Sequence, residues 1–177
     1  MHMLIGLISD THIDDKVESL PTNLGTYFKD VELILHAGDL TSPKVIEDLK
    51  KIAPTIAVQG NMDRFYGVDL PISHVETIEG VKIGVKHGEV NPKGDTQQLE
   101  YIARELEVDV LVSGHSHQPL IEQANNILLV NPGSPTKPLL TDPTVMLMTV
   151  EDGEVDVEII QLGPPTCSSL NFRKEEN

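Results

Sequence analysis

The chain has 177 residues, of which 39% are hydrophobic, so it can bury one core, and its length favours a single domain. A formal net charge of −15, without a clustered stripe of lysine and arginine, excludes a sequence-independent binder of extended nucleic acid. An aromatic content of 3% without tryptophan also removes the usual base-stacking platforms. No apolar stretch approaches the roughly 18 residues that a membrane span needs.

The start of the chain and its cysteine content bear on the compartment. The first residues, MHMLIGLISD, lack the basic region, apolar stretch and cleavage site of a secretory leader, which favours a cytoplasmic location. The single cysteine, Cys167, excludes an intrachain disulfide and a thiolate metal cage. Any bound metal would therefore be held by oxygen and imidazole nitrogen.

The first half of the chain alternates strands with helices. Apolar runs predict strands over 4–9, 33–37 and 55–59, with a helix of weaker pattern between Asp15 and Asp30. A second helix follows Ser42, because proline occupies its first turn and apolar residues then recur at helical spacing.

The second half is richer in hairpins. A helix opens at Asp95, which with Gln98 resembles a capping box, and it runs through Leu106. A single strand is predicted over 110–113. Three further pairs of short strands are separated by turn dipeptides and read as hairpins: 74–78 with 81–86, 121–124 with 127–130, and 145–150 with 155–161.

Strand–helix alternation followed by hairpins predicts an α/β fold, a layered sandwich in which two packed β-sheets are flanked by helices. We expect residues 1–162 to form this single domain. The segment 163–177 has neither periodicity nor apolar density, so we expect a polar, loosely ordered C-terminal tail.

Five of the apolar runs end on side chains that bind metals, usually beside a glycine. Because the carboxyl ends of strands in open α/β sheets lie along one rim, we expect these donors to converge. In an extended segment, period-two alternation also places both donors of Asp-x-His, or of His-x-His, on the same side. The donors are Asp10, His12, Asp39, Asn61, His87, His115 and His117. The set predicts a pair of divalent metal ions.

Such a pair has a defined chemistry. Two divalent ions would outweigh the carboxylates of Asp10 and Asp39 and attract a phosphate-ester anion. Ions about 3.5–4 Å apart lower the pKa of a bridging water and stabilise an in-line displacement at phosphorus. Oxygen and imidazole ligation suits manganese, which we favour, and also nickel, iron, cobalt or zinc.

The order of these motifs resembles the calcineurin-like metallophosphoesterases, especially their small bacterial and archaeal phosphodiesterases. The resemblance runs from Leu4 to Pro135, and the turn Asn131-Pro132-Gly133-Ser134 also resembles that subgroup. The motifs that carry it are Asp10-x-His12, Gly38-Asp39, Gly60-Asn61, His87-Gly88 and Gly114-His115-Ser116-His117.

The resemblance implies a four-layer sandwich and a binuclear phosphodiesterase in which a metal-bridging hydroxide attacks a small phosphodiester. It also implies a division of the ligands. Asp10, His12 and His117 would hold the first ion. Asn61, His87 and His115 would hold the second, and Asp39 would bridge the two.

The residues after Asn61 depart from the family pattern. Many relatives have a histidine where this chain has Met62, and that histidine contacts the phosphate and helps the leaving group. Asp63 is a candidate substitute as proton donor, provided that its pKa is raised, and Arg64 is a candidate contact for a phosphoryl oxygen. A carboxylate at Asp63 would repel a dianionic monoester more than a monoanionic diester, so we expect a preference for diesters.

Two alternatives stay open. One is a phosphomonoesterase or nucleotidase, and the other is a non-enzymatic scaffold like the retromer subunit that shares this fold. Relatives also suggest a homodimer. His36 is expected to be a buried core histidine that at most supports Asp39.

Overall fold

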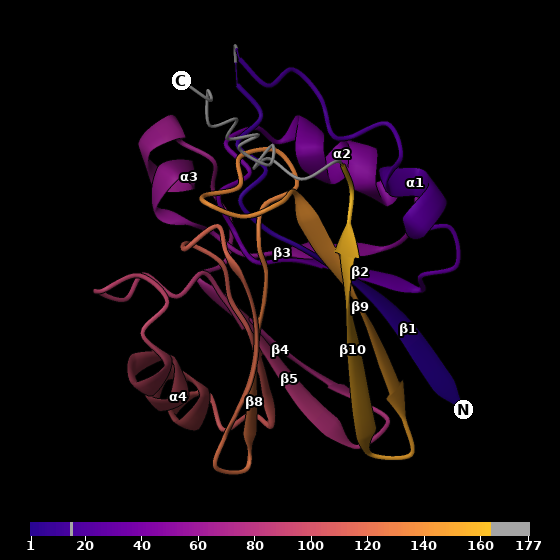
Figure 1. The fold of residues 1–177 in the computed structure, drawn as a ribbon, viewed down its shortest axis with the longest axis vertical. Helices are drawn as coiled ribbons and strands as arrows, with labels where there is room; N and C mark the ends of the chain where they lie inside the picture. The colour runs from indigo at the N-terminus through magenta and orange to yellow at the C-terminus, as the bar shows by residue number, and fades with distance from the viewer. Residues whose placement is uncertain (15, 164–177) are drawn as a thin grey trace, which may run out of the picture.

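The computed structural model describes residues 1–14 and 16–163. Its framework is two five-stranded β-sheets packed face to face (Figure 1). Sheet A has the order β10-β9-β1-β2-β3, and sheet B has the order β4-β5-β6-β8-β7.

Sheet A is mixed. Its central strand β1 pairs parallel to β2, with Ile5 opposite Leu33, and antiparallel to β9. The strands are β1 (His2–Ile8), β2 (Leu33–His36), β3 (Thr55–Ala57), β9 (Thr144–Glu151) and β10 (Glu154–Gln161).

Sheet B is mixed as well. Strands β5, β6 and β8 run parallel, with Val85 opposite Val112, while β4 and β7 pair antiparallel at the two edges. The strands are β4 (Ser73–Ile78), β5 (Val81–Lys86), β6 (Val110–Val112), β7 (Pro119–Ala124) and β8 (Ile127–Pro132).

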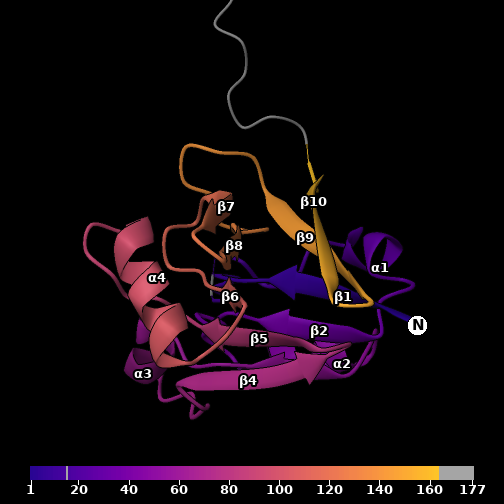
Figure 2. The same ribbon diagram turned by 90° about the horizontal axis from the view of Figure 1, so that it is seen from below.

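Three apolar clusters define four layers. Side chains such as Leu7 and Val112 form the core between the sheets. The outer face of sheet A packs against α1 (Leu24–Tyr27) and α2 (Lys44–Lys50), and the outer face of sheet B packs against α4 (Thr96–Glu105) (Figure 2). The predicted α/β sandwich with flanking helices is confirmed.

The secondary structure agrees with the predicted strands and differs in the helices. All ten predicted strands are present, and none of their ends is shifted by more than two residues. The helix expected between Asp15 and Asp30 is only the four residues of α1, and an additional helix, α3 (Asn61–Tyr66), lies where we predicted neither helix nor strand. At α4 the Asp95 carboxylate accepts from the Gln98 amide N–H at 2.8 Å, whereas the Gln98 side chain donates to the carbonyl of Asn91.

Two further expectations concern the C-terminal tail and membrane-spanning segments. Except for Gly163, the expected polar tail lies outside the described residues. None of the helices that the structure describes is long and apolar enough to cross a membrane.

Candidate metal centre

The metal-donor side chains come from both sheets and meet at one rim. On sheet A, Asp10 and His12 follow β1, Asp39 follows β2, and Asn61 follows β3 as the first residue of α3. On sheet B, His87 follows β5, and the Gly114–His117 loop follows β6. The centre therefore lies where the parallel strands of the two facing sheets end.

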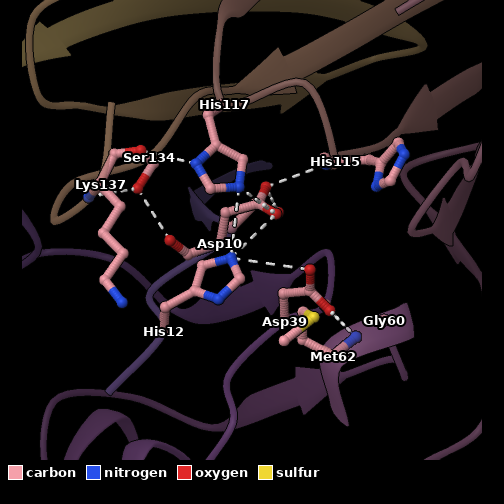
Figure 3. A network of polar contacts seen from close by, with 12 residues as sticks. Asp10, His12, Asp39, Gly60, Met62, His115, His117, Ser134 and Lys137 are labelled. Atoms are coloured by element: carbon pink, nitrogen blue, oxygen red, sulfur yellow. Dashed lines mark hydrogen bonds and ion pairs between the residues drawn. The ribbon is translucent and has the colours of Figure 1, made fainter. Parts of the chain in front are cut away.

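Two carboxylate oxygens lie between the histidines of the two sheets (Figure 3). Asp10 Oδ1 is 3.8 Å from His12 Nε2, 3.4 Å from His117 Nε2 and 3.9 Å from His87 Nε2. Asp39 Oδ2 is 3.6 Å from His12 Nε2 and 3.2 Å from His87 Nε2. The donors thus form two overlapping groups: Asp10, His12 and His117, and Asp10, Asp39 and His87.

His117 and His87 face this centre with the lone pair of Nε2. His117 Nδ1 donates to the carbonyl of Lys137 at 2.6 Å, and His87 Nδ1 donates to the carbonyl of Ala37 at 2.7 Å. A carbonyl can only accept, so in the neutral ring the proton lies on Nδ1 and Nε2 is bare. Metal-binding histidines have this arrangement.

The Asp10 carboxylate also fits a cation. Its Oδ1 is buried and has no hydrogen-bond partner among the described residues. Of the buried side-chain oxygen and nitrogen atoms in that part of the chain, this atom alone lacks one. Its Oδ2 accepts from the Ser9 hydroxyl and the His115 amide. A buried, unpaired carboxylate oxygen beside bare imidazole nitrogens is costly unless a positive charge lies between them. The donor set therefore fits a divalent metal ion.

The pKa of His87 reflects the same negative field. Burial lowers the pKa of this imidazole, but the carboxylates of Asp39 and Asp10 outweigh burial and raise it to about 9. Burial raises the pKa of the Asp39 carboxyl, yet His87, the Met62 amide and His12 bring it down to about 2. In the absence of a metal, a proton on His87 balances the carboxylates, as a cation would.

The other two expected ligands, Asn61 and His115, differ in whether their side chains reach the centre. Asn61 Oδ1 lies 3.1 Å from His87 Nε2, close to the carboxylates. The His115 ring lies beside His87, with ring centroids 5.2 Å apart, and points away from Asp10 (Figure 3). Its ring nitrogens join neither donor group, and the backbone N–H of His115 contacts Asp10 instead.

The donors do not lie on extended backbone. Asp10, His12, His115 and His117 have positive φ values of 53°, 42°, 72° and 60°, and Asp39 has a φ of 58°. Left-handed backbone is unfavourable for residues with a Cβ and is common at functional sites. Asp10 and His12 do fall in one donor group, as expected, whereas the ring of His115 does not join that of His117. The cause is not period-two alternation, because tight turns, and not extended strands, aim these side chains.

Two glycines allow the loops to approach closely. A Cβ on Gly60 would lie 2.1 Å from Asp39 Oδ1, and a Cβ on Gly114 would lie 2.0 Å from the Ser9 hydroxyl and 2.5 Å from Asp10 Oδ2. Any side chain at either position would displace a carboxylate of the centre.

A family model for the calcineurin-like phosphoesterase superfamily domain matches residues 3–153. The chain belongs to this superfamily. It is 55% identical over 172 residues, 97% of this chain and all of the relative, to a protein of Methanothermobacter thermautotrophicus named "Probable metallophosphoesterase".

Solved structures of other superfamily members have the same fold. A novel archaeal phosphodiesterase superposes with a TM-score of 0.69 at 25% identity, covering 89% of this chain and all of that chain. Wild-type Vps29 from Entamoeba histolytica in complex with Zn²⁺ superposes with a TM-score of 0.72 at 28% identity, covering 91% of this chain and all of that chain. The chain is thus similar in fold both to a phosphodiesterase and to a Vps29 that was solved with Zn²⁺.

The Asp63 side chain accepts hydrogen bonds from backbone amides of the neighbouring loops. The side chain is fully buried, and its two oxygens accept from the amides of Asp39 at 2.8 Å, Thr41 at 2.7 Å and Gly60 at 2.9 Å. Burial raises the pKa of the Asp63 carboxyl, and these hydrogen bonds oppose the rise. Because both oxygens already serve as acceptors, we do not retain Asp63 as the proton donor.

The side chains on either side of Asp63 are also placed. Arg64 forms an ion pair with Glu89 at 2.6 Å on the surface, so its guanidinium is engaged by a carboxylate. Met62 donates its N–H to Asp39 Oδ1 at 2.8 Å, and its half-buried side chain lies beside Asp39 (Figure 3).

Several supporting residues were not singled out from the sequence. The Ser134 hydroxyl donates to the carbonyl of Asp10 at 2.8 Å, and the Lys137 carbonyl fixes the ring of His117. Lys137 also forms an ion pair with Asp14. The Asn131–Ser134 turn motif is the sequence signal that could have located this loop, whereas nothing in the sequence points to Lys137.

Proposed function

We propose that this superfamily member is a phosphodiesterase that depends on two divalent metal ions. The single observation that supports this best is the placement of the Asp10 and Asp39 carboxylates between imidazoles from both sheets, with Asp10 Oδ1 unpaired and buried. The likeness to an archaeal phosphodiesterase favours diesters as the substrate class.

Under this proposal Asp10, His12 and His117 would hold one ion, and Asn61 and His87 would hold the other. Asp39 lies within reach of both histidine sets and is placed to bridge them. His115 would have to turn its ring toward the centre to join the second ion. Two such ions activate water and stabilise charge on the phosphoryl oxygens. Manganese is our first choice, and zinc is supported by the Vps29 complex.

The chain itself supplies orientation. The Lys137 and Ala37 carbonyls fix the tautomers of His117 and His87, and Asp63 holds the Asp39 loop in place. Met62 puts a thioether, which cannot donate a proton, beside Asp39. Without an acid there, substrates with good leaving groups should react fastest, and a dianionic monoester should be a poorer substrate than a diester.

The test compares kcat/KM for bis(p-nitrophenyl) phosphate and p-nitrophenyl phosphate after reconstitution with manganese, zinc, nickel, cobalt or iron. We expect the diester to be favoured and Asp39→Asn to abolish activity. A Met62→His variant supplies an imidazole that can donate to a phosphoryl oxygen, and the dianionic monoester gains most from such a charge-assisted hydrogen bond. Its monoester-to-diester ratio should therefore rise about tenfold. A monoester preference in the unmodified protein would refute the diester assignment.

The Vps29 likeness favours one alternative, a scaffold like the retromer subunit. Failure to hydrolyse either ester with any of the five metals would support it.

Our proposal also includes a small phosphodiester substrate, a cytoplasmic location and a homodimer. Light scattering tests the homodimer.

A further inference from the structure

Helix α3 exposes two large aromatic side chains next to the metal centre. The chain has only three phenylalanines and three tyrosines, yet Phe65 is 78% exposed and Tyr66 is 53% exposed. Their rings contact each other edge to face, with centroids 5.3 Å apart. Rings exposed to this extent contribute little to the core, so their presence here calls for another purpose.

The helix connects these rings to the centre. It begins at Asn61, and the Met62 N–H is hydrogen-bonded to Asp39 Oδ1. Residues three and four positions apart share a helix face, so Met62, Phe65 and Tyr66 form one stripe, which we call the α3 platform. Met62 lies beside Asp39 (Figure 3), and one turn further along α3 the two rings are exposed to solvent.

The α3 platform is apolar in a strongly acidic protein. The neighbouring acid, Asp63, is buried and bound to backbone amides, and the charge of Arg64 is paired with Glu89. Thioether and aromatic groups attract flat aromatic rings by stacking and by contacts with sulfur. A methyl or other small ester group would gain much less from the same surface.

We propose that the α3 platform binds an aromatic ester group of the substrate, such as a nucleobase. This inference rests on the proposed diesterase function and narrows its substrate class to diesters that carry an aromatic group on the non-leaving side. The ligand is the size of a nucleotide, which agrees with the absence of a basic track for extended nucleic acid. Stacking of one base on aromatic side chains is worth about 1–3 kcal/mol.

The test uses two diesters with the same leaving group, so that the bond that breaks is the same. These are thymidine 5′-(p-nitrophenyl phosphate) and methyl p-nitrophenyl phosphate, assayed with the metal-loaded, full-length protein. We expect the ratio of their kcat/KM values to favour the thymidine ester. In the double variant Phe65→Ala, Tyr66→Ala this ratio should fall about tenfold, mainly through KM for the thymidine ester.

Tyr101→Ala is the matched control, because Tyr101 is 60% exposed on α4 and is not part of the α3 platform. This variant should keep the wild-type ratio, and a Phe65→Trp variant should keep or increase it. Thermal unfolding of each variant shows whether the fold is retained, as expected for exposed positions.

The outcomes separate the two proposals. If the wild-type protein hydrolyses neither diester, the proposed function fails, and this inference fails with it. If it hydrolyses both and the double variant keeps the wild-type ratio, only the inference about the α3 platform is overturned. An unchanged ratio together with a smaller assembly by light scattering would assign the two rings to a protein interface instead.

Discussion

His36 connects two loops of the metal centre without facing it. Its Nδ1 accepts from the Gly38 amide at 3.1 Å, so its Nε2 carries the proton and donates to the Thr11 hydroxyl at 3.0 Å. Thr11 separates Asp10 from His12, and Gly38 precedes Asp39. This fully buried, neutral histidine therefore sets the distance between two groups of ligands, which explains its place in strand β2.

The buried state of His36 predicts acid sensitivity. Burial lowers the pKa of His36 from 6.5 to about 3. Below pH 6.5, His36 therefore binds a proton in the unfolded chain but not in the folded chain. The folded state loses stability as the pH falls from 6.5 toward 3. Between pH 6.5 and 4.5 this histidine should cost about 2 kcal/mol, because one pKa unit corresponds to about 1.4 kcal/mol.

The measurement is the free energy of unfolding in urea at pH 6.5 and 4.5, with chelator present, for the unmodified protein and His36→Gln. Glutamine can hydrogen-bond but cannot titrate, so the variant should be less stable at pH 6.5 and lose about 2 kcal/mol less on acidification. Equal losses in the two proteins would show that His36 does not titrate as described.

At the level of secondary structure, the strands were readable from the sequence and α3 was not. Apolar runs such as Val81–Lys86 are long enough to show a buried strand, and all ten appear. Helix α3 has six residues, too few for apolar periodicity, and its signals are the local ones of Asp63 in its first turn and Gly67 in left-handed conformation at its end. Short helices depend on such caps and on tertiary contacts.

The sequence predicts which residues gather at the candidate site but not how their side chains are oriented. Donors at strand ends are gathered by topology, which is why Asp10 and His87 meet although they are far apart in sequence. The direction of each side chain depends on left-handed turns that hydrogen bonds with other loops stabilise. His115 shows what the sequence does not predict, because its backbone N–H contacts Asp10 whereas its ring lies beside His87.

The junction between β3 and α3 gives a sharp steric prediction. Gly60→Ala would push a methyl group onto Asp39, and since Gly60 has a φ of −96° the effect is steric and not backbone strain. We expect a loss of about 1–3 kcal/mol in stability and much weaker metal binding. Calorimetric metal titration and urea unfolding measure both effects.

Gly25→Ala is the control for this substitution. A Cβ at Gly25, in α1, meets nothing within 4 Å, and alanine favours helix. That variant should be as stable as the unmodified protein or slightly more stable, with unchanged metal affinity. Wild-type metal affinity in Gly60→Ala would mean that Asp39 is free to move without cost.

For the molecule as a whole, metal binding should be a large part of thermal stability. A ligand present at a hundred times its dissociation constant adds about 2.7 kcal/mol. For a chain of this size that corresponds to roughly 5–10 °C in melting temperature. We therefore expect chelation to lower the melting temperature of the metal-loaded protein by this amount, as measured by scanning calorimetry.

Asp39→Asn provides the comparison, because it removes a carboxylate that lies 3.6 Å from His12 Nε2 and 3.2 Å from His87 Nε2. Its melting temperature should respond little to chelator or to added metal. An unmodified protein that melts at the same temperature with and without chelator would contradict metal-linked stability.

The donors are divided between the sheets, with Asp10, His12, Asp39 and Asn61 on one and His87, His115 and His117 on the other. Ions bound there would link the two sheets along one rim, in addition to the apolar core that lies between them. Under the proposed function, a cell that withholds metal would leave that rim without its ions and held by hydrogen bonds such as those from His87 to Ala37 and from Ser134 to Asp10. Scarcity of metal would then loosen the same rim at which the substrate would react.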